Sequence, residues 1–259
     1  MENVFYIDRL AYFAFPLNLI AGIFLVGVII FLYVYYRENR FVKWLGGMQG
    51  TLWIIGSLIF VLLGEGILAG RWFCTWPFVC LLLLLWVNLG LVVLRHIRAC
   101  SLRNVLFLLN HLGLWLALGG ALWGAPDRKS VKLIAYLRQP EYTAVDETGR
   151  LYPLPFTVTL EKFQVEYYDR MQRVPKKFRS ELILQNKECR LYTAIEVNEP
   201  VDFGGYSIYQ DNYDREKGLY SVLLLVRDPW LGIVYTGILM MIIGAVGLVV
   251  CGPLRKPNQ

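Results

Sequence analysis

Histidine is scarce in this chain, and cysteine pairs are absent. The 259 residues include 2 histidines and 5 cysteines, and no two cysteines stand in a CxxC spacing. The charge-rich stretch 125–229 contains no histidine and one cysteine, Cys189. A Ser-His-Asp or Cys-His catalytic set, a cysteine zinc site and an internal disulfide are therefore excluded there. Walker-type and dinucleotide-binding glycine patterns are also missing, so an autonomous soluble-type enzyme is not expected.

Charge is scarce as well. Charged residues make up 18% of the chain and apolar residues 56%, and the mean hydropathy is +0.46, which is too apolar for a soluble domain of this length. The first apolar run is about 26 residues long without a small-x-small cleavage site, which favours a retained helix over a signal peptide. Five runs are long enough to cross the hydrocarbon of a bilayer. They cover residues 11–36, 51–69, 77–94, 104–124 and 230–251.

The charges that are present indicate how the chain is oriented. Residues 125–229 hold 16 Lys and Arg against 16 Asp and Glu, so the net charge of +6 lies in the rest. A neutral polar region does not fit nucleic acid as a partner. The loops at 37–50 and 95–103 and the tail at 252–259 are basic, which predicts that these three are cytoplasmic. The N-terminus and residues 125–229 are then outside.

Residues 125–229 alternate apolar and polar side chains, which is typical of β-strands. The turn-forming residues 211–218 predict a hairpin between the last two strands. The predicted strands are 131–138, 156–165, 181–185, 191–197, 205–210 and 219–227. The expected fold is an integral membrane α-helical protein of about five transmembrane helices. A membrane domain at 1–124 precedes one mostly-β extracytoplasmic domain at 125–229, and 230–251 forms the closing helix.

His111 is the residue most able to carry chemistry. It lies on the order of 10 Å into the helix at 104–124, where an ionisable group usually marks a functional position. Imidazole is a common axial ligand of haem iron, although a histidine that bonds a neighbouring helix is the alternative. Trp115 and Phe107 lie four residues to either side, so they either flank a porphyrin or face lipid. His96 is expected in a cytoplasmic loop, as a solvated surface residue.

Glycines and one acidic residue complete the features of the predicted helices. Glu65, near the outer end of the second helix, is expected at the hydrated interface. Small residues permit close approach of helices and predict packing, not a reaction. They are Gly113, Gly119, Gly120 and Gly124 in the fourth helix and Gly237, Gly244 and Gly247 in the fifth.

Several motifs, in this order and spacing, resemble the ResB/CcsB family of system II cytochrome c biogenesis proteins, as a short variant. The resemblance runs from about residue 40 to 251. The motifs are Thr75-Trp76-Pro77-Phe78, Asn110-His111-Leu112-Gly113-Leu114-Trp115, Gly124-Ala125-Pro126-Asp127, Leu154-Pro155-Phe156, Leu160-Glu161-Lys162-Phe163, Gly205-Tyr206-Ser207-Ile208-Tyr209-Gln210 and Asp228-Pro229-Trp230.

The resemblance implies a non-autonomous subunit of the bacterial inner membrane. With a CcsA/ResC partner it would deliver haem across the membrane and attach it to apocytochrome c. Haem b would be held transiently between histidines of the two subunits, and His111 matches the family's membrane histidine. Trp115 is the candidate flanking residue. The alternative is a membrane-anchored assembly or binding module that never touches haem.

Overall fold

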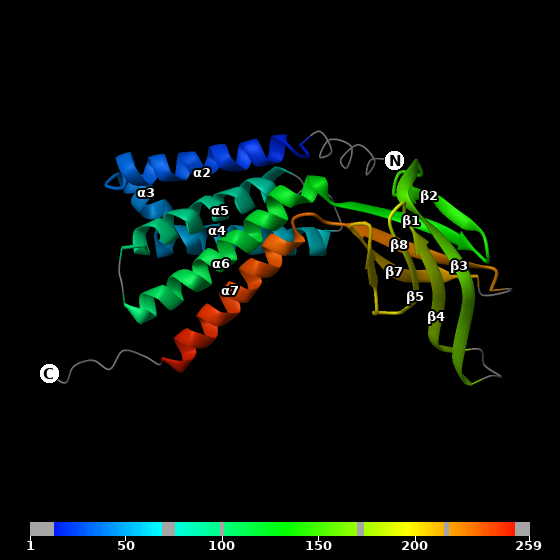
Figure 1. The fold of residues 1–259 in the computed structure, drawn as a ribbon. Coiled ribbons are helices and arrows are strands. Elements are labelled where there is room, and N and C mark those ends of the chain that lie inside the picture. Colours follow the sequence, from blue (N-terminus) through cyan, green and yellow to red (C-terminus); the bar gives the residue numbers. More distant parts are fainter. Residues whose placement is uncertain (1–12, 69–75, 99–100, 170–173, 215–217, 252–259) are drawn as a thin grey trace. The chain divides into compact units, whose positions relative to one another are not determined.

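The computed structural model describes residues 13–68, 76–98, 101–169, 174–214 and 218–251. The tail at 252–259, Cys74, Cys100 and the side chain of Glu65 lie outside this description. The chain divides into two compact units: Arg128–Asp228 forms a β domain, and the segments before and after it form a helical unit. Figure 1 labels the elements of both units.

The helical unit is built from long apolar helices. Four of them, α2, α5, α6 and α7, are long and apolar enough to cross a membrane, and α4 contains a shorter apolar segment, Met48–Gly64. The protein is therefore a membrane protein that carries a β domain, while the crossing by α4 stays a prediction. The helices are α2 (Leu17–Tyr36), α3 (Arg40–Leu45), α4 (Met48–Leu68), α5 (Trp76–His96), α6 (Leu102–Gly124) and α7 (Leu231–Val250).

Besides shifts of one to three residues at other helix ends, two features of the helical unit differ from the prediction. Helix α2 begins at Leu17, not at residue 11, because Pro16 occupies its N-cap position and the described residues before it form turns. The loop predicted at 37–50 contains the short helix α3, whose start is capped by the Asn39 side chain accepting the Phe41 N–H. A single capped turn and a half is too short for hydrophobic periodicity to reveal.

The β domain is one antiparallel sheet of eight strands in the order β5-β4-β3-β2-β1-β8-β7-β6. Strands β7 and β8 pair from Ser207 with Val226 to Tyr213 with Ser221, which confirms the predicted hairpin. Two strands were missed: β2, which starts at a proline and alternates poorly, and β6, which has three residues. The strands are β1 (Lys129–Tyr136), β2 (Pro140–Asp146), β3 (Leu151–Asp169), β4 (Val174–Gln185), β5 (Arg190–Glu196), β6 (Val201–Phe203), β7 (Tyr206–Tyr213) and β8 (Tyr220–Arg227).

The sheet curls so that strands far apart in its order face each other. Ser180 on β4 donates to the Gln210 side chain on β7 over 2.6 Å, and its hydroxyl lies 3.0 Å from that of Ser221 on β8. All three side chains are buried, and the Gln210 amide also donates to Ser221 Oγ over 2.7 Å. A polar network therefore closes the interior of the sheet.

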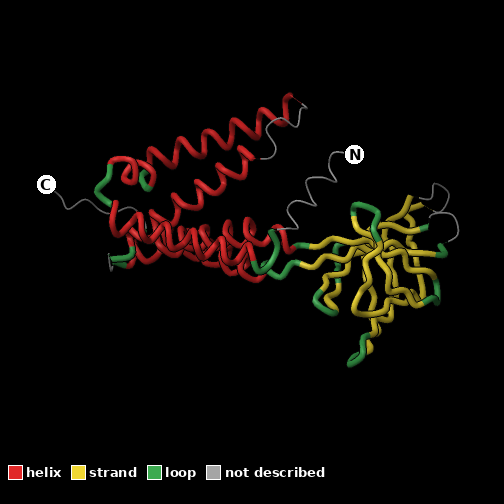
Figure 2. Tube along the Cα trace, turned by 90° about the horizontal axis from the view of Figure 1, so that it is seen from above, coloured by secondary structure: helices red, strands yellow, loops and turns green. Residues whose placement is uncertain are grey.

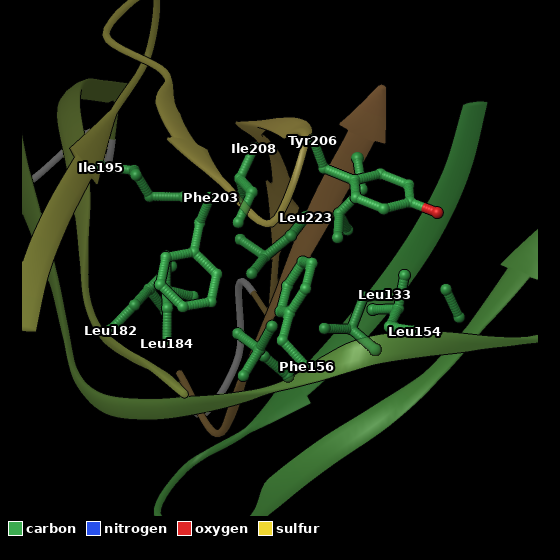
Figure 3. Close-up of a cluster of buried hydrophobic side chains, with 14 of the residues drawn as sticks. Leu133, Leu154, Phe156, Leu182, Leu184, Ile195, Phe203, Tyr206, Ile208 and Leu223 are labelled. Atoms are coloured by element: carbon green, nitrogen blue, oxygen red, sulfur yellow. The ribbon is translucent and has the colours of Figure 1, made fainter. Parts of the chain in front are cut away.

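One apolar core fills the curled sheet. Figure 2 shows the strands of the β domain gathered into a compact group, and Figure 3 shows side chains from both halves of the sheet pointing toward one another. Phe156 on β3 meets Phe203 on β6 edge to face, with ring centroids 5.2 Å apart. Burial raises the pKa of Tyr206 to about 12, and a hydrogen bond with Tyr152 adds to the effect, so this phenol stays neutral in the core.

Replacing Gln210 with leucine should loosen the β domain. The change keeps most of the side-chain volume but removes the bonds to Ser180 and Ser221, at a cost of about 1–3 kcal/mol. Hydrogen exchange of the β7 and β8 amides in the full-length chain in detergent should accelerate. The matched control is Gln185→Leu, because that glutamine is exposed at the end of β4. Equal exchange in the two variants would contradict a stabilising role for the buried network.

Candidate functional site

His111 lies on α6, nine residues after its first residue, or roughly 14 Å along the helix axis. Its Nδ1 is 2.9 Å from the carbonyl oxygen of Phe107, one turn earlier. Because a carbonyl oxygen only accepts, Nδ1 carries the proton and Nε2 keeps its lone pair. The ring is half-buried. Its own helix therefore holds the imidazole in the tautomer that binds a metal through Nε2.

The ring of Phe107 packs against the imidazole of His111. The two rings stack with their centroids 3.9 Å apart and their planes 27° apart. The contact and the bond from Nδ1 both restrain the side-chain torsions of His111. A ligand held in one orientation before binding loses less entropy when it binds.

Trp115 is engaged in a packing contact. Its indole stacks on that of Trp86 from α5, with centroids 4.7 Å apart and planes 10° apart. Each indole N–H donates to the other residue's backbone carbonyl over 3.0 Å. This reciprocal pair joins α5 to α6 one turn beyond His111. A flanking role of Trp115 toward haem stays a prediction.

The glycines of α6 face two different neighbours. A Cβ at Gly113 would lie 2.5 Å from the carbonyl oxygen of Gly237 on α7, whereas a Cβ at Gly119 would meet the indole nitrogen of Trp86 on α5. Asn110 adds a hydrogen bond of 3.0 Å from its amide to the Met241 carbonyl. Backbone contact with α7 thus holds the part of α6 that carries His111.

Arg95, near the end of α5, joins this helix to α3. Its guanidinium donates to the carbonyls of Val42 and Gly46 over 2.8 and 2.7 Å and to that of Lys43 over 3.2 Å. Val42 and Lys43 belong to α3, and Gly46 is its C-cap residue. Arg95 is therefore a structural cation as well as part of the basic pattern that predicted topology.

Sequence patterns missed a junction at Asp127. Its carboxylate accepts from the Phe15 backbone N–H over 2.7 Å, the Asn18 amide over 2.7 Å and the Trp230 indole over 2.6 Å. These donors come from the start of α2 and the residue before α7, while Asp127 follows α6. The signal in the sequence was a lone asparagine, Asn18, in an apolar run, since a polar side chain in such a run usually serves a neighbouring helix.

The residues present suit a haem iron better than a free metal ion. Among the described residues, no group of three or more histidine, cysteine, aspartate or glutamate side chains is placed to hold a metal ion. His111 supplies one neutral imidazole beside an aromatic ring, and haem iron needs only axial ligands from the protein because the porphyrin fills the other positions. The second axial ligand would come from another residue or another subunit.

Cysteine adds no ligand set. Cys80, Cys189 and Cys251 are free and exposed. Cys189 lies in the turn before β5. The described cysteines are isolated from one another in sequence and do not extend the site at His111.

Comparisons with known proteins agree with the sequence motifs. A family model for the ResB-like family matches residues 98–225. Protein NrfI of Wolinella succinogenes is 32% identical over 95 residues, and the chain matches about a tenth of that protein's length, 10% against 36% of its own.

Among solved structures, Cytochrome c Heme Lyase CcmF is similar over 91% of this chain and 46% of its own, with 14% identity. The TM-score of 0.39 does not establish a shared fold. The match over residues 98–225, which carry His111 and most of the β domain, places the chain in the ResB-like family.

Proposed function

We propose that this chain is a subunit of a system II cytochrome c maturation complex. It acts with a CcsA/ResC-type membrane partner in moving haem across the bacterial inner membrane and attaching it to apocytochrome c. Family membership supports this role, as does the combination of apolar helices with a polar β domain. Because residues 125–229 contain no histidine and one cysteine, we expect the chain alone to lack synthase activity.

His111 is the proposed haem ligand. The observation that carries the proposal is the bond from its Nδ1 to the Phe107 carbonyl, which leaves the Nε2 lone pair for iron within the family-matched segment. When bound, haem b would be shared, with the other axial histidine supplied by the partner subunit. Phe107 and the α6–α7 contact would keep the imidazole oriented. Trp115, which stacks on Trp86, is the proposed residue flanking the porphyrin.

The proposed topology follows from the charges. Five crossings, α4 included, put the N-terminus and the β domain outside and the C-terminus in the cytoplasm. This orientation lets haem arrive at the basic end of the helical unit and be used on the side where the β domain lies. A reporter fused after Gln259 would then report the cytoplasm, and one inserted near Gly149, in the turn between β2 and β3, would report the outside.

The test is the purified complex with His111 replaced. His111→Ala should lower retained haem about tenfold or more, because no ligand remains on this helix. Leu109→Ala is the matched control: it truncates a half-buried side chain two residues away, on a different face of α6. Haem is measured by absorption spectrum per assembled complex. Added imidazole should partly restore binding in His111→Gly, where it can fill the vacated volume.

A second outcome favours a different function. An assembled His111→Ala complex that keeps wild-type haem and matures cytochrome c normally would rule out the ligand role. The chain would then be a membrane-anchored assembly module without haem contact. Loss of haem in Leu109→Ala to the same extent would assign the effect to folding of α6.

A further inference from the structure

Both histidines of this chain contact the same phenylalanine, although they come from different helices. His96 is the last residue of α5, and its ring lies 4.6 Å from that of Phe107, centroid to centroid. His111 stacks on Phe107 at 3.9 Å. We propose that His96 is a second iron-ligating residue, and that His96 and His111 form two successive haem-binding positions on α5 and α6. This inference rests on the proposed function of His111.

The imidazole of His96 has the same hydrogen-bonding arrangement as that of His111. Its Nδ1 is 2.9 Å from the Val92 carbonyl, one turn back in α5, so Nδ1 carries the proton and Nε2 holds the lone pair. The residue is exposed, whereas His111 is half-buried. The pair therefore offers one accessible imidazole at the end of the helical unit and one deeper imidazole of the same tautomer.

The arrangement is held together by contacts within the helical unit. The Asn104 side chain donates to the backbone carbonyl of His96 over 2.7 Å, which joins the first turn of α6 to the end of α5. Ser101 caps α6 by accepting the Asn104 N–H over 3.2 Å. Phe107 is then fixed beside His96, and His111 lies one turn, or about 6 Å, further along α6.

Transfer between the positions would be a ligand exchange. His96 would release the iron from its Nε2, and His111 would bind it through its own Nε2 lone pair, with no change in the oxidation state of the iron. Both Nδ1 atoms would keep their protons and their hydrogen bonds to the backbone carbonyls, so the exchange needs no proton donor and no redox partner.

Charge at this end of the helical unit suits the anionic propionates of haem. Arg95 binds the Val42 carbonyl in α3, so the basic residues around α3 lie beside the end of α5. Lys43 in this region pairs with Glu38. The same charges also serve topology, so they support the proposal and do not carry it. The basic residues are Arg37, Arg40, Lys43, Arg95, Arg98 and Arg103.

The experiment titrates ferric haem into the full-length chain purified free of haem in detergent. Four forms are compared: wild type, His96→Ala, His111→Ala and the double variant. Ile97→Ala is the matched control, since Ile97 is exposed and adjacent to His96. Absorption and electron paramagnetic resonance spectra report histidine ligation, and stopped flow reports its rate.

If His96 is a loading position, His96→Ala should reach the wild-type final spectrum about tenfold more slowly. His111→Ala should keep a weaker histidine-ligated signal, and the double variant should lose that signal. Loading of His96→Ala at the wild-type rate, with equal spectra for His111→Ala and the double variant, would overturn the role of His96 and leave His111 intact. Wild-type haem affinity in His111→Ala would instead contradict the proposed function.

Discussion

Replacing Gly237 with alanine is expected to destabilise the helical unit strongly. The new Cβ would lie 2.5 Å from both the Ala117 nitrogen and the Gly113 carbonyl oxygen. These are backbone atoms of α6, so no side-chain rotation relieves the clash, and the two helices must separate. We expect a cost of about 3 kcal/mol or more, and a lower melting temperature for the purified chain in detergent.

The same helix provides the matched control. A Cβ at Gly232 meets nothing within 4 Å, so Gly232→Ala should be neutral or slightly stabilising, because alanine favours helix. Gly237→Ala should also weaken haem binding although it changes no ligand, since α7 holds the segment of α6 that carries His111. Equal melting temperatures for the two variants would contradict the close α6–α7 contact.

Replacing Asp127 with alanine is expected to loosen three helix ends together. The Phe15 N–H, the Asn18 amide and the Trp230 indole all lose their common acceptor. The expected loss is about 3 kcal/mol, because three hydrogen bonds to a charged acceptor disappear together. Hydrogen exchange at the first turns of α2 and α7 should accelerate, while the β7 and β8 amides should exchange as in wild type.

Graded variants separate the carboxylate from its surroundings. Asp127→Asn keeps one acceptor oxygen, and Trp230→Phe removes one donor but keeps an aromatic ring beside Gly124. The expected order of destabilisation is Asp127→Ala, then Asp127→Asn, then Trp230→Phe. An Asp127→Ala chain that exchanges like wild type at α2 and α7 would show that packing alone holds this junction.

Much of the β domain could be predicted because apolar and polar side chains alternate along several of its strands. Strand β1 alternates inward Val131, Leu133 and Ala135 with outward side chains, and β8 does the same. Strand β2 escaped prediction because Pro140 starts it and its burial does not alternate cleanly. Local periodicity is visible in sequence only where one face is consistently buried.

The candidate site was only half visible in the sequence. His111 stood out as a lone ionisable residue in an apolar run, whereas His96 was interpreted as an unrelated surface residue of a loop. The structure puts His96 at the end of α5, in contact with the ring on which His111 stacks. Trp115 shares a stripe with His111, but its partner, Trp86, belongs to another helix and follows from no local spacing.

The sequence by itself determined the class of this protein. Long apolar runs require lipid around them, alternating segments require a sheet, and the absence of histidine from 125–229 confines imidazole chemistry to the helices. Tertiary structure decided which residues meet. Asp127 accepts from Phe15, 112 residues earlier, and Ser180 bonds Ser221 across the curled sheet. Such contacts depend on how whole helices and strands pack against one another, and they cannot be predicted from the spacing of residues within one element.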